Sequence, residues 1–269
     1  MARTVIVLLV LLIAAPARVA AQPIEVDLEL LLMVDVSRSM SPNELEIQRR
    51  GYASALASAE VYAAMRSGLL GRIALAYVEW AGSQHVVVGW QMIETREDLQ
   101  AFADRVTASF NPALRRTSIS EALFFGAGMI AGNDYQGLRR VIDISGDGPN
   151  NAGRRVTYAR DLVVAQGITI NGLPLLTSEG LGSQWHLDQL DIYYRTCVIG
   201  GPGAFVIPVL DWVDFAEAVR RKLVLEIAAR PQRARVFRAQ MIRRDPTDCL
   251  IGEKIWNERR RMMGDFNGP

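Results

Sequence analysis

Residues 30–40, LLLMVDVSRSM, constrain the fold of this chain most strongly, because a run of apolar residues ends on a carboxylate and two hydroxyls follow at alternate positions. The five large apolar residues at 30–34 predict a strand that is buried on both faces, as in the middle of a parallel sheet. Asp35, Ser37 and Ser39 then fall in a short loop after this strand. Open α/β sheets bind ligands at the carboxyl ends of their strands, so this loop is a candidate site.

A helix is expected directly after the loop. Ser41, Pro42 and Glu44 suit its N-cap, first and third positions, and a serine and a glutamate at this spacing form a capping box. The pattern predicts one helix from Ser41 to about Arg66. Further along the chain, strands are predicted at 72–81, 85–92, 139–145, 168–175 and 204–210, and helices at 95–107, 118–131, 154–166, 187–194 and 211–229.

The alternation of strands and helices predicts an α/β fold with a doubly wound, mostly parallel sheet and helices on both faces. The strands at 72–81 and 85–92 are separated by only three residues. Because so short a connection cannot make a parallel crossover, these two strands are expected to form an antiparallel hairpin at one edge of the sheet.

The N-terminal residues predict a cleaved secretory signal peptide. Arg3 supplies a positive charge, an apolar segment follows at 5–15, and small residues at 19–21 precede Gln22. The apolar segment is too short to span a bilayer, and no later segment approaches the ~20 apolar residues of a membrane span. We therefore expect residues 1–21 to be removed, leaving a periplasmic or secreted protein without a transmembrane segment.

The two cysteines, Cys197 and Cys249, suit an oxidising compartment, where an even number is most simply one disulfide. Such a bond would close a loop of roughly 50 residues and contribute on the order of 4 kcal/mol in the chain-entropy model. Two separate buried thiols are the alternative.

Residues 230–269 differ in composition from the α/β region predicted at 22–229. They hold ten Lys or Arg against five Asp or Glu. A disulfide through Cys249 would tether this basic C-terminal extension to the domain, where it either has no binding role or docks an acidic surface. The net charge of the whole chain is only +1, which argues against a dedicated nucleic-acid binder.

Three segments of the chain resemble the von Willebrand factor type A (VWA) domain. Residues 35–39 match the D-x-S-x-S pattern of that family, Arg-Thr at 116–117 is similar to its second metal-site segment, and Ser-Gly-Asp-Gly at 145–148 is similar to its third. A single D-x-S-x-S match would be weak, but three segments in the family's order are specific. The resemblance covers roughly residues 25–229. With Gly-Gly-Pro-Gly at 200–203, near Cys197, the sequence also resembles an uncharacterised group of exported bacterial proteins with such a domain.

This resemblance implies a metal-ion-dependent adhesion site. Its side chains would bind the cation or hold its waters. The chemistry agrees, since Mg²⁺ takes six oxygens at about 2.0–2.1 Å, two carboxylates balance its charge, and hydroxyls add no further charge. The set contains no Cys or His, which disfavours zinc and copper; Mn²⁺ and Ca²⁺ are the alternatives to Mg²⁺. The implied ligands are Asp35, Ser37, Ser39, Thr117 and Asp147.

Each residue of this set also has an ordinary structural interpretation. The hydroxyls can be loop or helix-cap groups, and Asp147 with the glycine after it is a common turn pair. The chain departs from the family at Arg38, where glycine is frequent, and at Gly146, where a threonine or similar residue is usual. Asp143 competes with Asp147 for the last position, but it falls inside the expected strand and would support the ligands indirectly at most.

Three functions are compatible with these patterns. The preferred one is an exported binding module, not an enzyme, that engages an acidic residue of a protein partner through a bridging Mg²⁺. The second is a metal-dependent hydrolase, which needs a general base beside the metal that the motifs do not supply. The third is a disulfide-stapled structural domain with a vestigial metal site. His85 and His186 have no evident nucleophile partner and are expected at the surface or in packing.

Overall fold

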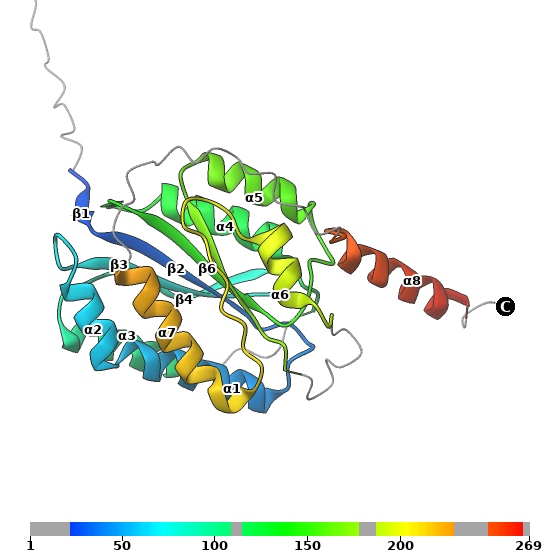
Figure 1. Cartoon of the computed structure of the whole chain (residues 1–269), viewed down its shortest axis with the longest axis horizontal. Coiled ribbons are helices and arrows are strands. Elements are labelled where there is room, and N and C mark those ends of the chain that lie inside the picture. The colour runs from blue at the N-terminus through cyan, green and yellow to red at the C-terminus, as the bar shows by residue number, and fades with distance from the viewer. Residues whose placement is uncertain (1–21, 109–114, 178–186, 229–246, 266–269) are drawn as a thin grey trace, which may run out of the picture.

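A computed structural model describes residues 22–108, 115–177, 187–228 and 247–265 (Figure 1). The predicted signal peptide at 1–21 and most of the first half of the C-terminal extension lie outside the described residues. Within the described ranges, no helix combines the length and apolarity that a bilayer crossing requires.

A five-stranded sheet organises the fold. Its strands, in the order in which they pair, are β4 (Gln84–Ile93), β3 (Ile73–Trp80), β2 (Leu28–Asp35), β6 (Arg140–Gly146) and β7 (Thr169–Pro174). The central strand β2 is buried along its whole length and runs parallel to both of its neighbours. At one edge β4 pairs antiparallel with β3, and at the other β7 pairs parallel with β6. The predicted fold class is confirmed.

Helices cover both faces of this sheet (Figure 1). One face carries α1 (Pro42–Leu56), α2 (Ala59–Arg66), α3 (Arg96–Ala108) and α7 (Phe215–Ala228). The opposite face carries α4 (Ile119–Ala131), α5 (Val156–Ala165) and the short α6 (Leu190–Tyr193). The C-terminal helix α8 (Ile251–Asp265) projects away from the sheet at its side (Figure 1).

The apolar run of β2 supplies both hydrophobic cores. Leu30 and Leu32 belong to the core beneath α1, α3 and α7, whereas Leu31 and Met33 belong to the core beneath α4 and α5. Because successive side chains of a strand point to opposite faces, a strand covered by helices on both sides must be apolar at every position. This requirement explains why the sequence shows no alternation at 30–34.

The prediction of one helix from Ser41 to Arg66 is wrong, because the chain makes two. The first begins as expected, with Ser41 and Glu44 forming both bonds of the capping box. It ends at Leu56, and Ser58 then caps α2 by accepting from the backbone N–H of Val61. The Ser58 hydroxyl also donates to the carbonyl of Ala55 at 2.6 Å, so one side chain closes the first helix and starts the second.

The strand predicted at 204–210 is also wrong. This segment makes only isolated bridges, from Val206 to Gly172 and from Val209 to Leu175. Between them lies Pro208, which lacks the N–H that a continuous ladder requires. The helix predicted at 211–229 instead begins with a 3₁₀ turn at Trp212–Asp214.

A small second sheet was not predicted. It pairs β1 (Ile24–Val26) in parallel with β5 (Tyr135–Gly137). Strands of three residues are too short to show a hydrophobic period, and this pairing joins segments more than a hundred residues apart.

Candidate functional site

The three segments that resemble the VWA metal site meet at one edge of the sheet. The neighbouring strands β2 and β6 end at Asp35 and Gly146, and Thr117 lies two residues before α4. Because parallel strands place their carboxyl ends at the same edge, the loops after β2 and β6 lie together. A pocket of about 590 Å³ opens there, and its lining includes four of the five predicted residues, namely Ser37, Ser39, Thr117 and Asp147.

The fifth predicted residue, Asp35, is fully buried beneath this pocket. Its Oδ1 accepts a hydrogen bond from the backbone N–H of Ser37 at 2.7 Å. The side chain of Gln48, on α1, holds the backbone carbonyl of Asp35 at 2.8 Å. The second carboxylate oxygen, Oδ2, is buried and has no hydrogen-bond partner. A buried, unpaired carboxylate oxygen is costly, and a cation would satisfy it.

The hydroxyls of the first segment join the two carboxylates. Ser37 Oγ and Ser39 Oγ lie 2.9 Å apart and share a hydrogen bond. The Ser37 hydroxyl lowers the pKa of Asp35, and the Ser39 and Ser37 hydroxyls lower the pKa of Asp147, in each case by stabilising the charged carboxylate. The alternate spacing of the two serines therefore puts both hydroxyls on the side of the loop that faces Asp147.

The two carboxylates repel one another in a buried setting. Burial raises the pKa of Asp35 well above its usual value, and the charge of Asp147 raises it further. Burial likewise raises the pKa of Asp147 to about 6, against the opposing effect of its hydrogen bond with Ser39. Two like charges held together away from water favour either a proton or a metal ion between them.

Glu44 is a third carboxylate near the site, and sequence reasoning assigned it only to the capping box. Its charge contributes to the raised pKa of Asp147. Its own oxygens are engaged, since Oε2 accepts from the Ser41 backbone N–H at 2.6 Å and Oε1 accepts from Trp212 Nε1 at 3.0 Å. Among the residues that the structure describes, no three His, Cys, Asp or Glu side chains form a metal-binding group. The candidate ligands are therefore two carboxylates and three hydroxyls, a set suited to a hard cation.

Gly146, one of the two departures from the family pattern, has a structural reason here. A Cβ at this position would lie 2.7 Å from the Tyr194 hydroxyl and 2.9 Å from Asp35 Oδ2. Both are closer than real Cβ contacts, so a side chain at 146 would displace the buried carboxylate. Tyr194, which directly follows α6, occupies the room that a residue such as threonine would need.

Thr117 is held by the loop that follows Asp147. Its backbone N–H donates to Asn151 Oδ1 at 3.0 Å, and the backbone N–H of Asn151 donates back to the Thr117 carbonyl at 2.9 Å. This pair of bonds fixes the second and third segments to each other. The adjacent asparagines at 150–151 were not singled out from the sequence, although two asparagines after Asp-Gly-Pro are a recognisable loop signature.

The start of α4 is not capped by the side chain of its own N-cap residue. Ser118 occupies the N-cap position, but its hydroxyl donates to the carbonyl of Ala152 at 2.9 Å and makes no cap bond. The fully buried Asn150 replaces it, since its Oδ1 accepts from the backbone N–H of Ser120 at 3.0 Å. Glu121, at the third position of the helix, accepts two bonds from the Arg154 guanidinium.

Asp143, the competitor for Asp147, belongs to a different cluster. It forms a buried ion pair with Lys222 of α7, whose Nζ also lies 2.6 Å from Glu226 Oε1. Asn171 Nδ2 donates to the same glutamate oxygen at 2.8 Å. Burial raises the pKa of Glu226 to about 7, and the charge of Asp143 adds to the effect. Sequence reasoning missed Lys222 and Glu226, because a lysine and a glutamate four residues apart usually mark an exposed helix face.

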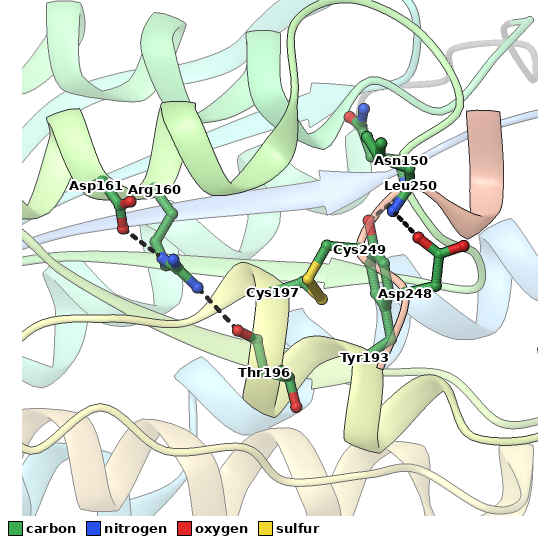
Figure 2. Close-up of a disulfide and its surroundings, with 9 residues drawn as sticks. All are labelled: Asn150, Arg160, Asp161, Tyr193, Thr196, Cys197, Asp248, Cys249 and Leu250. Atoms are coloured by element: carbon green, nitrogen blue, oxygen red, sulfur yellow. Dashed lines mark hydrogen bonds and ion pairs between the residues drawn. A yellow bond between two sulfur atoms is a disulfide. The ribbon is translucent and has the colours of Figure 1, made fainter. Parts of the chain in front are cut away.

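A disulfide joins Cys197 to Cys249, and Figure 2 shows it. Cys197 lies in a π-helical turn, Tyr194–Val198, that continues α6. Cys249 lies two residues before α8, where Asp248 Oδ1 accepts from the backbone N–H of Leu250 at 3.0 Å (Figure 2). The bond therefore holds the start of α8 against the domain.

The remaining predicted residues do not join the site. His85 is exposed on the edge strand β4. His186 lies outside the described residues. The glycines at 200–203 form a turn beyond Cys197, with Gly200 bridged to Ile170 of β7.

The fold is that of the VWA class. Among solved structures, proximal thread matrix protein 1 (PTMP1) from the mussel byssus has a TM-score of 0.56 at 13% identity, covering 77% of this chain and 49% of that one. The pilus adhesin SpaC from Lactobacillus rhamnosus GG has a TM-score of 0.55 at 10% identity, covering 77% and 31%. A second PTMP1 structure, with a zinc-occupied MIDAS motif, has a TM-score of 0.52 at 14% identity and the same coverage as the first.

The chain belongs to the family described as protein of unknown function (DUF1194), whose model matches residues 25–231. None of the curated proteins matches it in sequence. The chain spans about half the length of the mussel protein, 49% of it, and less of the adhesin.

Proposed function

We propose that this protein is an exported binding module that holds a divalent cation at the pocket and engages a carboxylate of a protein partner through it. The observation that carries the proposal is the buried Oδ2 of Asp35, which has no partner and belongs to one of two mutually repelling carboxylates. Ligands from the protein would be Asp35, Ser37, Ser39, Thr117 and Asp147.

The donor set favours Mg²⁺, with Mn²⁺ or Ca²⁺ as alternatives. Two carboxylates balance the charge of the ion, and three hydroxyls coordinate it as neutral oxygens. Bound there, the cation would act as a Lewis acid with room in its shell for one oxygen from outside the protein. Because a carboxylate is the hard, anionic oxygen ligand that proteins offer most readily, the expected partner presents an acidic side chain.

A binding role fits the site better than hydrolysis. Hydrolysis needs a base that can take a proton from a water on the metal. Glu44 is the carboxylate near Asp147, but both of its oxygens already accept hydrogen bonds, from Ser41 and Trp212. The structural relatives named above include a pilus adhesin and a byssus matrix protein, which supports a role in attachment.

Titration of the metal-free protein with Mn²⁺, followed by electron paramagnetic resonance and by thermal unfolding, tests the proposal. At roughly ten times its Kd, the ion should stabilise the fold by about 1.4 kcal/mol. Asp35→Ala should abolish both effects. The matched control is Asp104→Ala, which removes the same charge from an exposed position on α3. Binding that survives Asp35→Ala, or that is absent from the unaltered protein, would refute the proposal.

A further inference from the structure

The pocket extends beyond the five candidate ligands, and its other walls differ in chemistry. Three exposed arginines, Arg38, Arg115 and Arg116, belong to the lining. An apolar part of the lining comes from Ile255 and Trp256, two partly buried residues of α8. A helix of the C-terminal extension thus forms part of the same pocket as the candidate cation site.

This wall is built into the domain by specific contacts. The Cys197–Cys249 disulfide fixes the chain two residues before α8. Within its first turn, Glu253 Oε1 accepts from the buried Asn150 Nδ2 at 2.8 Å. Asn150 also caps α4, so the helix is tied to the loop that supplies Asp147.

The packing of α8 is as close as the backbone allows. A Cβ at Gly252 would lie 2.1 Å from the carbonyl oxygen of Asn150, so only glycine lets the helix approach the loop this closely. A helix that merely trailed from the domain would not need such an approach. The close contact brings Ile255 and Trp256 within reach of whatever occupies the pocket.

Arg116 connects the cationic and apolar walls. Its guanidinium lies 5.6 Å from the centroid of the Trp256 ring. The backbone of Arg116 has φ of 71°, a left-handed conformation that is uncommon for a residue other than glycine. Strain of this kind persists where the surrounding structure imposes it, and here it accompanies an arginine directed at the aromatic wall.

We infer that the pocket selects a short acidic peptide segment of the partner, in which one carboxylate meets the cation, a second acidic group meets the arginines, and an apolar side chain lies against Ile255 and Trp256. The inference rests on the proposed function and adds the class of ligand to it. Charge complementarity with the three arginines favours an acidic segment. The apolar wall formed by Ile255 and Trp256 favours a ligand that also carries an apolar side chain. A cavity of this size suits a few residues of chain rather than a flat protein face.

α8 is accordingly a specificity element rather than a passive tail. This gives the C-terminal extension a role at the cation pocket through the apolar residues of α8, whereas the arginines that meet acidic groups come from the domain. The arginines would steer an acidic segment into the pocket, and the tryptophan would discriminate among segments by the residue next to the acid.

Selection from a phage-displayed library of random heptapeptides on the full disulfide-bonded protein, in the presence of Mn²⁺, tests the inference. Enriched peptides should carry at least two acidic residues beside an aliphatic or aromatic one. Arg116→Gln and Trp256→Ala should each weaken the best synthetic peptide by roughly tenfold, as expected for interface anchor residues. Trp256→Ala, which alters no metal-site segment, should keep the unaltered affinity for Mn²⁺ and the unaltered melting temperature.

Matched controls are Arg221→Gln, an exposed arginine on α7, and Met262→Ala, an exposed residue further along α8. Both should leave peptide affinity unchanged. Mn²⁺ binding without enrichment of acidic–apolar peptides would overturn the inference while leaving the cation site intact. Enriched peptides that bind Trp256→Ala and Arg116→Gln as tightly as the unaltered protein would overturn it as well. Failure of the unaltered protein to bind Mn²⁺ would overturn the proposed function itself.

Discussion

Lys222→Met should destabilise the protein strongly, and by an amount that depends on pH. Lys222 is fully buried between Asp143 of β6 and Glu226 of α7 and forms an ion pair with each. Methionine fills a similar volume but supplies no charge. The substitution therefore leaves two carboxylates facing each other in the dry interior, one of which, Asp143, stands three residues before Gly146.

The expected loss of stability follows from the burial of Lys222, Asp143 and Glu226. Breaking a buried ion pair by removing one partner costs about 3–5 kcal/mol, because the remaining charge is left uncompensated. The burial of Glu226 already raises its pKa to about 7 with the lysine present. Without Lys222, a carboxyl of the folded protein keeps its proton to a still higher pH, whereas in the unfolded chain it ionises near its ordinary value.

The sign of the pH dependence is fixed by this difference. Between the ordinary pKa of a glutamate and the raised pKa in the fold, the folded state binds more protons than the unfolded state, so stability falls as pH rises. We expect Lys222→Met to lose roughly 4 kcal/mol at pH 8 and less than about half of that at pH 5, where the carboxyls can be neutral.

Urea unfolding followed by tryptophan fluorescence at pH 5 and pH 8 measures both values. With m of about 2 kcal/mol/M, the expected loss at pH 8 shifts the midpoint by about 2 M. The triple variant Asp143→Asn, Lys222→Met, Glu226→Gln is the control, since it removes the charges along with the lysine and should recover most of the loss. Equal destabilisation at the two pH values, or a loss below about 1 kcal/mol at pH 8, would refute the reasoning.

Three further variants test local features of the structure. Gly146→Ala should weaken Mn²⁺ binding at least tenfold in a titration, because its Cβ would displace Asp35 Oδ2, whereas Gly128→Ala, with open space around its Cβ, should not. Ser58→Ala should lower the free energy of unfolding by about 1 kcal/mol through loss of the α2 cap, with an unchanged value counting against the cap. Cys197→Ala with Cys249→Ala should cost about 2–4 kcal/mol in urea unfolding, and an unaltered midpoint would contradict a stabilising disulfide.

Local sequence patterns were sufficient to predict an element of the fold wherever the interaction that decides it lies within a few residues. The capping box joins Ser41 and Glu44, which are three residues apart, and the structure forms both of its bonds. The short link before β4 excludes a parallel crossover by length alone, and β4 is indeed the antiparallel edge strand. By contrast, the break between α1 and α2 was missed, since an Ala-rich segment favours helix on both sides of Ser58 and only the cap bonds reveal the boundary.

The buried polar cluster around Lys222 could not be predicted from local sequence patterns. Lys222 and Glu226 stand four residues apart, a spacing typical of a solvated helix face. They are buried because Asp143 and Asn171, on β6 and β7, lie beneath α7. No local pattern encodes that docking, so the sequence could not distinguish a buried pair from an exposed one.

The sequence by itself determined the fold class, the central place of β2 and the small set of oxygen-bearing residues that meet at one sheet edge. Those features follow from hydrophobic period, cap chemistry and the rule that parallel strands end together. Only the tertiary structure decided the unpaired state of Asp35 Oδ2, the need for glycine at 146 and the presence of α8 at the pocket. Each of these depends on groups brought together from distant parts of the chain, such as Tyr194 against Gly146 and Glu253 against Asn150.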